Sequence, residues 1–465
     1  MSLHKQAINY TVGRVLAALI GFCVLVYYSH AMQPELYSRY VESLVIVNVL
    51  NLFLFQWLRV TMTRFLSATH ISDGINFSSF FTIYLVIILF ILFIFFIFSF
   101  LIDPTFIFIT AIMLVSCSLN DFFLEVLRSK FLSLRYSIQY VVRQLLIACI
   151  SYLLISYDVS YPIHIAYILG NTLSLAVNIN VWATDIRLTN CFKKMRQIII
   201  NGSPLSINYG ISALMNNIDK LIVIQLVGKE IGGIYSLIID LVRQAVMIVM
   251  EAVNLAAYPN VVREYTSKGA IAAISKMKLV LKLLLLSGGG TVLTFWIFAG
   301  FIGNEVLGSD YAAGALILMP IIALATLLRG MKVYYFDQAF QLTVNNSSLM
   351  INAIISLFAM IAIYFILTQY EGMEMAAYAN LTTFFATMLL SLFSGRKFLK
   401  LSICPLFTIL YSAFFILLFL GFTSFDIIQL NLLNQLLCFG LFIFVYGLAS
   451  VTYLFFDMRT SHVKP

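Results

Sequence analysis

Polar side chains recur at regular spacing inside an apolar stretch that is long enough to cross a membrane. The stretch 235–259 reads YSLIIDLVRQAVMIVMEAVNLAAYP, and one series in it has intervals of 4, 3, 4, 3 and 4: Asp240, Gln244, Met247, Glu251, Asn254 and Tyr258. At 3.6 residues per turn, the series forms one stripe along a helix, with Arg243 at its edge. The opposite side is aliphatic, with Leu237, Ile238, Leu241, Ile248 and Val249. Because a charge at membrane depth is costly, the stripe predicts a helix face turned to a water-filled cavity or to the protein interior.

Other apolar segments also contain embedded charges. These are Arg14 in 9–30, Arg59 in 42–62, Asp121 and Glu125 in 105–127, and Asp219 and Lys220 in 205–226. At about 1.5 Å per residue, Asp219 and Lys220 reach a depth similar to that of Asp240 and Arg243 in the next, antiparallel segment. We therefore expect Lys220 to pair with Asp240, and Asp219 with Arg243.

The embedded charges also have purely structural interpretations. The two expected pairs would then only neutralise one another and fix helix packing. Arg14 and Arg59 have no acid within reach on their own helix, so they would extend to the membrane interface. Asp121 and Glu125 are spaced i, i+4 with Arg128 three residues further on. They predict either an ion pair at a helix end or a site for a proton or Na⁺.

The composition excludes a soluble protein. The 465 residues are 62% hydrophobic and only 10% charged, with a mean hydropathy of +0.99, whereas soluble domains have about 25% charged residues. The six cysteines are scattered singly, without metal-ligand spacing. The chain also has no phosphate-binding loop and no nucleotide fingerprint. We expect no catalytic residues, no cofactor, no metal and no nucleic-acid partner.

Fourteen apolar segments of about 20 residues predict an all-α polytopic membrane protein. They are 9–30, 42–62, 79–102, 105–127, 138–157, 162–182, 205–226, 233–257, 279–301, 312–333, 347–368, 373–393, 402–422 and 431–456. Basic residues gather in alternate loops, Lys332 included, and the loops between these are mostly acidic. Since basic loops stay in the cytoplasm, both termini are predicted to be cytoplasmic. The first segment has no obvious cleavage site and is interpreted as a span. The segment 79–102 is almost wholly apolar and predicts a lipid-facing helix.

Two short matches indicate an internal repeat with a period of about 200 residues. INY occurs at 8–10 and 207–209, and YSRYVE at 37–42 resembles YSLIID at 235–240. This spacing covers six spans, so the two halves are related by an axis along the membrane normal. The predicted organisation is two pseudo-symmetric six-helix lobes, 1–200 and 201–400, followed by an extra helix pair at 401–465. The Gly288–Gly290 run in an apolar segment predicts close helix packing or a kink.

The layout and one long stretch resemble a known group of membrane proteins. NNIDKLIVIQLVGKEIGGIYSLIIDLVRQ at 216–244, followed by YPNVVREY at 258–265, resembles the Wzx-type polysaccharide biosynthesis or O-antigen flippases. These flippases are part of the multidrug/oligosaccharidyl-lipid/polysaccharide (MOP) exporter superfamily. The resemblance implies a protein of the bacterial cytoplasmic (inner) membrane. Its implied activity is to move a polyprenyl-pyrophosphate-linked oligosaccharide, an O-antigen (lipopolysaccharide) or capsule-type repeat unit, to the outer leaflet. Alternating access coupled to H⁺ or Na⁺ is implied.

Under this resemblance, the embedded residues acquire roles. A lipid-linked sugar has a greasy tail, an anionic pyrophosphate and a polar glycan, so the cavity needs cations, amides and aromatic rings. The candidate substrate-binding residues are Arg14, Arg59, Lys220, Arg243, Gln244 and Asn254. The candidates for ion coupling or a structural charge network are Asp219, Asp240, Glu251, Asp121 and Glu125. Related lipid II flippases have cavity arginines on the first, second and eighth helices, where this chain has Arg14, Arg59 and Arg243. Besides membrane lipids, the implied partners are the polymerase and chain-length proteins of the same pathway.

Three other functions remain open. A MATE-like multidrug or cation antiporter of the same fold commonly has an acid in its first helix, whereas the segment 9–30 has Arg14 and no acid. A membrane glycan polymerase or ligase generally has a large outer loop bearing Arg or His. The acidic-side loops of this chain are short, and their basic residues are Arg39 and Lys229. A scaffolding subunit would not require embedded charges.

Overall fold

A computed structural model of the protein describes most of the chain. The described residues are 3–66, 77–101, 103–182, 196, 198–200, 204–343, 345–370, 372–401, 434, 437–438, 440–442 and 445–447. Every regular element in these ranges is a helix. The prediction of an all-α polytopic membrane fold is therefore confirmed.

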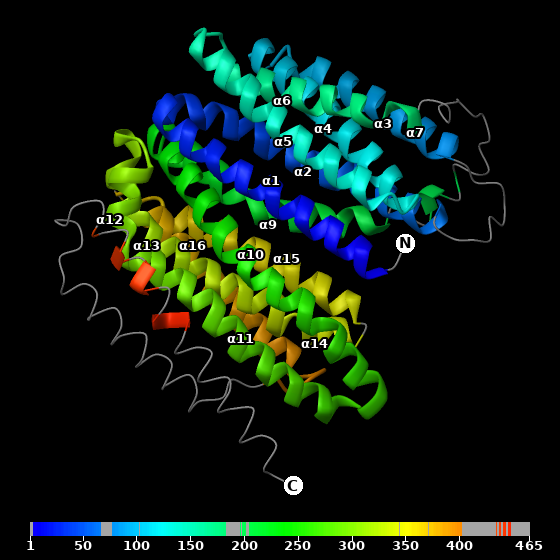
Figure 1. Ribbon diagram of the computed structural model, residues 1–465, viewed down its shortest axis with the longest axis vertical. Coiled ribbons are helices and arrows are strands. Elements are labelled where there is room, and N and C mark those ends of the chain that lie inside the picture. Colours follow the sequence, from blue (N-terminus) through cyan, green and yellow to red (C-terminus); the bar gives the residue numbers. More distant parts are fainter. Residues whose placement is uncertain are drawn as a thin grey trace. The chain divides into compact units, whose positions relative to one another are not determined.

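The chain separates into two compact units, residues 1–233 and 234–465. Helices pack side by side in the first unit (Figure 1). They are α1 (Leu3–Ala31), α2 (Pro34–Leu66), α3 (Phe77–Phe98), α4 (Pro104–Ser129), α5 (Ser133–Ser156), α6 (Pro162–Leu173), η1 (Ser174–Asn178), α7 (Ile179–Trp182) and α9 (Pro204–Leu226). Helix α2 packs against α4 and α9, and α5 packs against α1 and α6.

The second unit is built around α13 and contains two π-helical turns. Its elements are α10 (Lys229–Lys268), α11 (Ala270–Ile297), α12 (Ala299–Phe301), η3 (Ile302–Val306), α13 (Ser309–Met331), η4 (Lys332–Phe336), α14 (Gln338–Leu342), α15 (Asn346–Leu367) and α16 (Glu374–Gly395). The first turn of α10 is grouped with the first unit. Helix α13 packs against both α11 and α16.

Eleven described segments are long and apolar enough to span a membrane. They correspond to predicted spans one to six and eight to twelve. The seventh predicted span is α9, a helix of 23 residues that is not among these eleven. The thirteenth span, 402–422, and most of the fourteenth, 431–456, lie outside the described residues.

Several predicted spans were shorter than the helices. The eighth span was expected to end at 257, whereas α10 runs to Lys268. Lys276 and Lys278, expected in a loop, lie in α11.

The tenth span was expected to end at 333 with Lys332 in a loop, but the helical segment runs from Ser309 to Leu342. Lys332 lies in the π-helical turn η4, where it is buried and paired with Asp337. The pair neutralises the lysine, so the helix continues through a position that the sequence marked as its end.

Local sequence signals explain several helix ends. Pro104 begins α4, and the preceding Asp103 accepts a hydrogen bond from the Thr105 amide at 3.0 Å, as expected of a capping carboxylate followed by proline. Asn345 caps α15 in the same way. Gly269, with φ of 82°, makes the turn between α10 and α11, because glycine adopts positive φ without strain.

The glycine run in α11 is explained by close packing. A Cβ atom on Gly288 would lie 2.8 Å from Leu327 Cδ1 of α13 and 3.1 Å from Met250 Sδ of α10. Helix α11 continues unbroken through the run. Of the two expectations, close helix packing is confirmed and a kink is not found.

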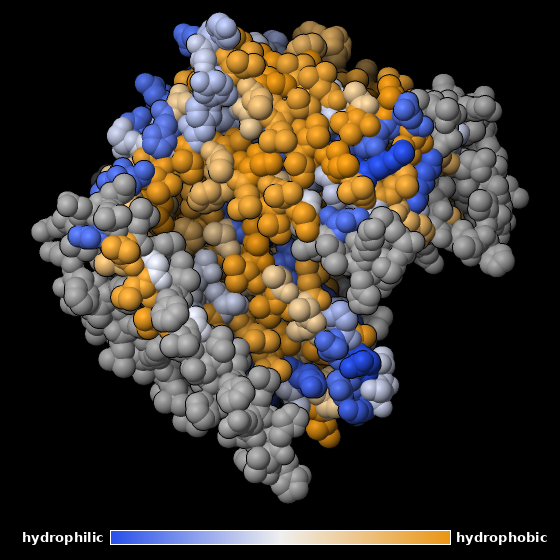
Figure 2. Space-filling model, viewed as in Figure 1, coloured by the Kyte–Doolittle hydropathy of each residue, from blue (hydrophilic) through white to orange (hydrophobic). Residues whose placement is uncertain are grey.

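The surface matches a protein that is surrounded by lipid. Figure 2 shows broad apolar areas on one face, with hydrophilic residues gathered in separate patches. Many large apolar side chains of α3 are exposed, including Leu89, Phe90, Phe93 and Phe96. This is expected for the helix predicted to face lipid, because apolar side chains are favourably solvated by the hydrocarbon of a bilayer.

The two Tyr-Ser pairs of the predicted repeat are equally buried, which does not test the repeat. Tyr37 and Ser38 near the start of α2, and Tyr235 and Ser236 near the start of α10, are all fully buried. The contact boundary at 233/234 groups α9 with the first unit, whereas the repeat places it in the second lobe. The division into lobes 1–200 and 201–400 and a pair at 401–465 stays a prediction.

Candidate functional site

Two arginines from different helices share one carboxylate inside the first unit. Arg59 of α2 donates from Nη1 to Asp121 Oδ2 of α4 at 2.9 Å, and Arg143 of α5 donates from Nη1 to Asp121 Oδ1 at 3.3 Å. Asn51 of α2 donates to the same Oδ2 at 2.8 Å. We call Arg59, Asp121 and Arg143 the arginine cluster. It joins α2 to the consecutive helices α4 and α5.

The cations of the cluster are buried and its acid is the most accessible member. The side chains of Arg59 and Arg143 are 5% and 12% exposed, and that of Asp121 is 27% exposed. Arg59 also donates from Nε and Nη2 to Gln56 Oε1, at 3.0 and 2.6 Å, and from Nη1 to Asn51 Oδ1 at 3.1 Å. The prediction that Arg59 only extends to the interface is therefore wrong, because it lies in a built network.

The cluster has a net charge of +1 at membrane depth. Asp121 lies eight residues before the end of α4 and Arg143 ten residues after the start of α5, or about 12–15 Å from those ends. The hydrocarbon core is about 30 Å thick. An uncompensated positive charge at this depth attracts an anion, since low polarity strengthens electrostatic attraction.

A row of tyrosines leads along α1 and α5 to the cluster. The Arg143 guanidinium lies 4.7 Å from the centre of the Tyr140 ring. Tyr140 stacks on Tyr136 with 6.0 Å between ring centres, and Tyr136 contacts Tyr10 edge-on at 5.1 Å. All three tyrosines are half-buried. Arg14 is exposed and lies within hydrogen-bonding reach of the Tyr136 hydroxyl.

Glu125 lies one helical turn beyond Asp121 and makes a separate contact set. It accepts a hydrogen bond from Thr63 of α2 and pairs with Arg128 at 3.4 Å. The Arg128 side chain is 56% exposed. The expected ion pair at the helix end is therefore present for Glu125, whereas Asp121 pairs with the two buried arginines.

The second unit presents the polar stripe of α10 on its accessible side. Asp240, Gln244, Glu251 and Asn254 are all half-exposed, as are Arg243, Met247 and Tyr258. On the opposite side, Leu237, Ile238 and Leu241 are fully buried, and Ile248 is exposed. The helix thus packs into its unit through Leu237, Ile238 and Leu241, whereas Ile248 departs from the predicted pattern.

The structure does not test the predicted pairing between α9 and α10. Asp219 and Lys220 are buried in α9, which is grouped with the first unit. Asp240 and Arg243 belong to the second unit. Both sets of charges have interactions within the protein. The pairs Lys220–Asp240 and Asp219–Arg243 stay predictions.

A second buried ion pair lies in the second unit. Lys332 Nζ is 2.8 Å from Asp337 Oδ2, and the two side chains are 7% and 8% exposed. The pair is spaced i, i+5 across η4, and this spacing brings the two side chains together where the helix widens to a π-turn.

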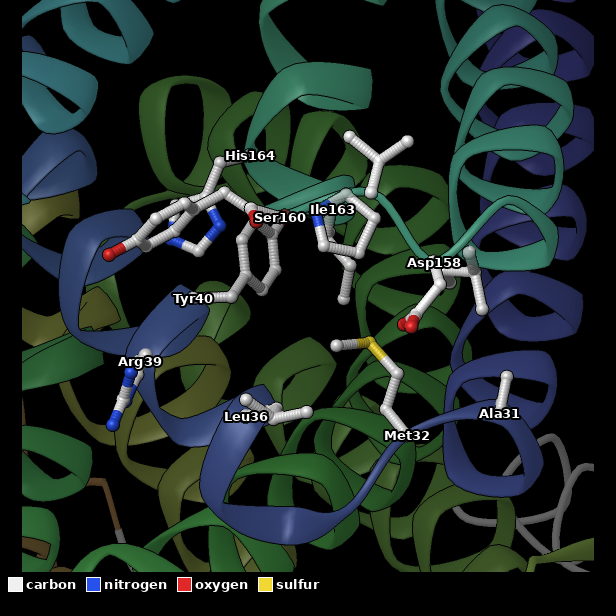
Figure 3. A pocket seen from close by; sticks show the side chains of 13 residues that line it. Ala31, Met32, Leu36, Arg39, Tyr40, Asp158, Ser160, Ile163 and His164 are labelled. Carbon is white, nitrogen blue, oxygen red and sulfur yellow. The ribbon is translucent and has the colours of Figure 1, made fainter.

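A cavity of about 430 Å³ lies at the other end of the first unit from the arginine cluster. It is lined by the loop after α1, the first turns of α2 and the loop between α5 and α6. Figure 3 shows Asp158 and Met32 pointing into it, whereas Arg39 points away. Asp158 and Tyr161 have positive φ angles of 52° and 59°. With an inward carboxylate and no inward cation, this cavity does not suit an anion.

The sequence identified only part of the cluster. It singled out Arg59 and Asp121 separately and did not predict that they meet. It missed Arg143 and Tyr140 altogether. The available signal was an arginine inside the predicted span 138–157, because an intramembrane arginine marks a functional position by default. Among the residues that the structure describes, no group of three His, Cys, Asp or Glu side chains is placed to hold a metal.

The fold and the embedded charges define an all-helical, multi-pass membrane protein. The family model "Polysaccharide biosynthesis protein" matches residues 3–265. This match includes the whole arginine cluster and the stripe of α10. The chain belongs to the polysaccharide biosynthesis protein family. A comparison with curated proteins found no match.

Solved structures of transporters share the fold. The lipid II flippase MurJ, in an inward closed conformation, superposes with a TM-score of 0.75 at 13% identity, over 97% of this chain and 100% of that one. A multidrug resistance MATE family transporter of the MOP superfamily, in an outward-facing conformation, gives 0.58 at 13% identity over 84% and 95%. A mutant of the Vibrio cholerae MATE transporter VcmN gives 0.56 at 11% identity over 84% and 96%. At these identities the comparisons establish the fold.

Proposed function

We propose that the protein is a flippase that moves a polyprenyl-pyrophosphate-linked oligosaccharide from the cytoplasmic to the outer leaflet. The observation that carries the proposal is the arginine cluster, a net cation embedded at membrane depth. The family match and the fold shared with a lipid II flippase support the same substrate class. The distribution of basic loops predicts that both termini are cytoplasmic and that the cluster lies nearer the cytoplasmic side.

Pyrophosphate is the anion that the cluster is best suited to bind. Its oxygens accept paired hydrogen bonds from the planar guanidinium fork, which a lysine cannot offer. Asp121 holds the two forks in place through one contact each, at 2.9 and 3.3 Å. Its partial exposure leaves it open to competition from a second anion. The carboxylate thus occupies the position that a phosphate group takes when substrate arrives.

Exchange at Asp121 also offers a site for ion coupling. When a phosphate group displaces the carboxylate from Arg59 and Arg143, the carboxylate loses both cations and can take a coupling ion, H⁺ or Na⁺, in their place.

The glycan requires surfaces of a different kind. The half-exposed rings of Tyr10, Tyr136 and Tyr140 offer flat apolar faces with hydroxyl groups, which suit sugar rings. In the second unit, Arg243, Gln244 and Asn254 line the open side of α10. These amides and this cation supply hydrogen bonds along the path by which the glycan crosses. We place the tail in lipid, outside both surfaces.

The function has a cellular setting that follows from the substrate. Polyprenyl-linked repeat units of O-antigen or capsule type are assembled at the bacterial inner membrane, so the protein works there. The polymerase and chain-length proteins that use the flipped unit are its expected partners. A MATE-like cation antiporter is disfavoured, because an acid that already holds two arginines does not offer a cation its charge.

The proposal is tested by transport in proteoliposomes. Purified full-length protein is reconstituted with a polyprenyl-pyrophosphate-linked oligosaccharide, and the glycan reaching the opposite leaflet is measured with a membrane-impermeant glycosidase. We expect movement that depends on the protein and is lost when the substrate has no phosphate groups. Transport of organic cations without movement of the lipid-linked glycan would show an antiporter instead.

A further inference from the structure

A groove in the second unit has a cationic rim and an apolar floor. It lies between the end of α10 and the start of α11 and has a volume of about 550 Å³. Its floor is made of small side chains, Ala252, Ala256 and Ala257, opposite Leu279 and Leu283 of α11. Alanines at these positions leave a hollow where longer side chains would fill the space between two packed helices.

The groove lies on a different face of α10 from the polar stripe. Ala252, Ala256 and Asn260 are spaced by four residues and line the groove, whereas Glu251 and Asn254 belong to the stripe. At 100° per residue, the two rows point to different sides of the helix. A ligand in the groove is therefore distinct from one that binds along the stripe.

The rim of the groove favours an anion. Arg263, Glu264 and Lys276 line it. Glu264 pairs with Lys268, whose Nζ lies 3.1 Å from Oε2. Within the described part of the chain, neither the Arg263 nor the Lys276 side chain takes part in an ion pair, and both are exposed. The rim thus has two positive charges that no acid compensates.

We propose that this groove binds one anionic phospholipid, with the phosphate between Arg263 and Lys276 and an acyl chain along the alanine floor. The charge complementarity selects the headgroup, and the apolar floor distinguishes a lipid from a free phosphate. The basic loops orient this end of α10 and α11 toward the cytoplasm. Basic pockets between membrane helices on that side bind anionic lipid headgroups. The proposal does not depend on flippase activity.

The test measures lipid bound to the purified full-length protein by native mass spectrometry. Phosphatidylglycerol and phosphatidylcholine are titrated separately into detergent-solubilised protein. We expect retention of phosphatidylglycerol over phosphatidylcholine. The double variant Arg263→Gln, Lys276→Gln lowers the apparent affinity for phosphatidylglycerol about 30-fold, because each basic residue near the membrane surface adds about fivefold.

Two further variants distinguish the contribution of the lipid headgroup to the affinity from that of the acyl chain on the alanine floor. Lys278→Gln is the matched control, since Lys278 is exposed on the same helix and does not line the groove. It leaves phosphatidylglycerol binding within about twofold of wild type. Ala256→Phe keeps all charges and fills the floor, and it lowers the affinity about tenfold. Thermal unfolding confirms that each variant is folded.

Two outcomes would overturn the proposal. Equal loss of phosphatidylglycerol in the double variant and in Lys278→Gln would show only diffuse attraction to a basic surface. Inorganic phosphate that displaces phosphatidylglycerol, together with an Ala256→Phe variant that binds normally, would show a phosphate site without a lipid chain.

Discussion

Two buried charge sites in the described part of the chain differ in the charge that they leave uncompensated. Lys332 and Asp337 lie on one continuous helical segment, are both almost wholly buried, and sum to zero charge. The arginine cluster joins α2, α4 and α5, has one positive charge in excess, and exposes its acid more than its cations. A closed neutral pair has no capacity for a further ion, whereas an open cluster with excess charge has one.

Burial alone does not distinguish a structural ion pair from a ligand-binding one. We expect the uncompensated charge to distinguish them. Both sites take charges out of water, which is costly unless the partners and hydrogen bonds are complete. At Lys332 a single acid balances the charge. At Asp121 three donors meet one carboxylate, and the proposed function adds a second anion to them. Export per folded molecule is the quantity on which the two sites are expected to differ.

The largest expected effect is that of Arg59→Gln. Removing one cation makes the cluster neutral, and export per folded molecule falls at least 100-fold, since truncating one partner of a buried charge pair costs about 2–5 kcal/mol. Arg128→Gln is the matched control, because Arg128 is mostly exposed and pairs only with Glu125. Surface glycan, normalised to membrane-inserted protein, is the measurement. Normal export by Arg59→Gln would remove the distinction between the two sites.

Asp121→Asn is expected to separate binding from release. The change raises the net charge of the cluster to +2 and keeps the side-chain shape. Binding of a polyprenyl-pyrophosphate substrate becomes tighter, and export falls about 30-fold because release slows. Binding and transport in proteoliposomes are measured on the same protein, with and without a proton gradient. Weaker binding would mean that Asp121 positions the arginines instead of competing with the substrate.

Arg243→Ala extends the comparison to the stripe of α10. Arg243 is half-exposed on the open side of the helix, so its loss removes a cation from the proposed path of the glycan. Export falls about tenfold, whereas Arg243→Lys retains part of it because a lysine keeps the charge but lacks the fork. Leu255→Ala, at an exposed position of the same helix, serves as control. Equal export by the alanine and lysine variants would exclude recognition by the guanidinium.

Lys332→Met has the smallest expected effect on export per folded molecule, within about twofold. It leaves Asp337 buried and unpaired, which destabilises the fold by about 3–5 kcal/mol. Adding Asp337→Leu restores most of that stability, since an apolar pair replaces the ion pair. Protein yield and thermal unfolding in detergent measure stability, and surface glycan measures export. A specific transport defect in a well-folded double variant would place Lys332 in the transport path.

Most of the fold was readable from the sequence because the bilayer imposes a strict rule. A spanning segment needs about 20 apolar residues, and this length alone located eleven helices. The rule fails where a charge is neutralised locally. Lys332 was predicted to be a loop residue because its partner, Asp337, is five residues away. That spacing brings two side chains together only in a π-turn, which the sequence pattern did not predict.

The site was harder to predict because its members come from different helices. The i, i+4 spacing of Asp121 and Glu125 suggested one shared function, but Asp121 meets Arg59 and Arg143 while Glu125 meets Thr63 and Arg128. The spacing of polar residues shows which of them share one face of a helix. It does not show which other helix packs against that face. The polar stripe of α10 could be recognised from the sequence, because the polar face of a helix is a property of that helix alone.

The arginine cluster has a thiol beside it. Cys117 lies one helical turn from Asp121, is buried, and is contacted by Asn51 at 3.5 Å and by the Tyr167 hydroxyl at 3.1 Å. A rearrangement that moves both Asn51 and Tyr167 away from Cys117 is expected to expose the thiol to alkylating reagents. In a variant that lacks the exposed Cys23 and Cys149, the rate of alkylation of Cys117 would then report the opening of the cluster.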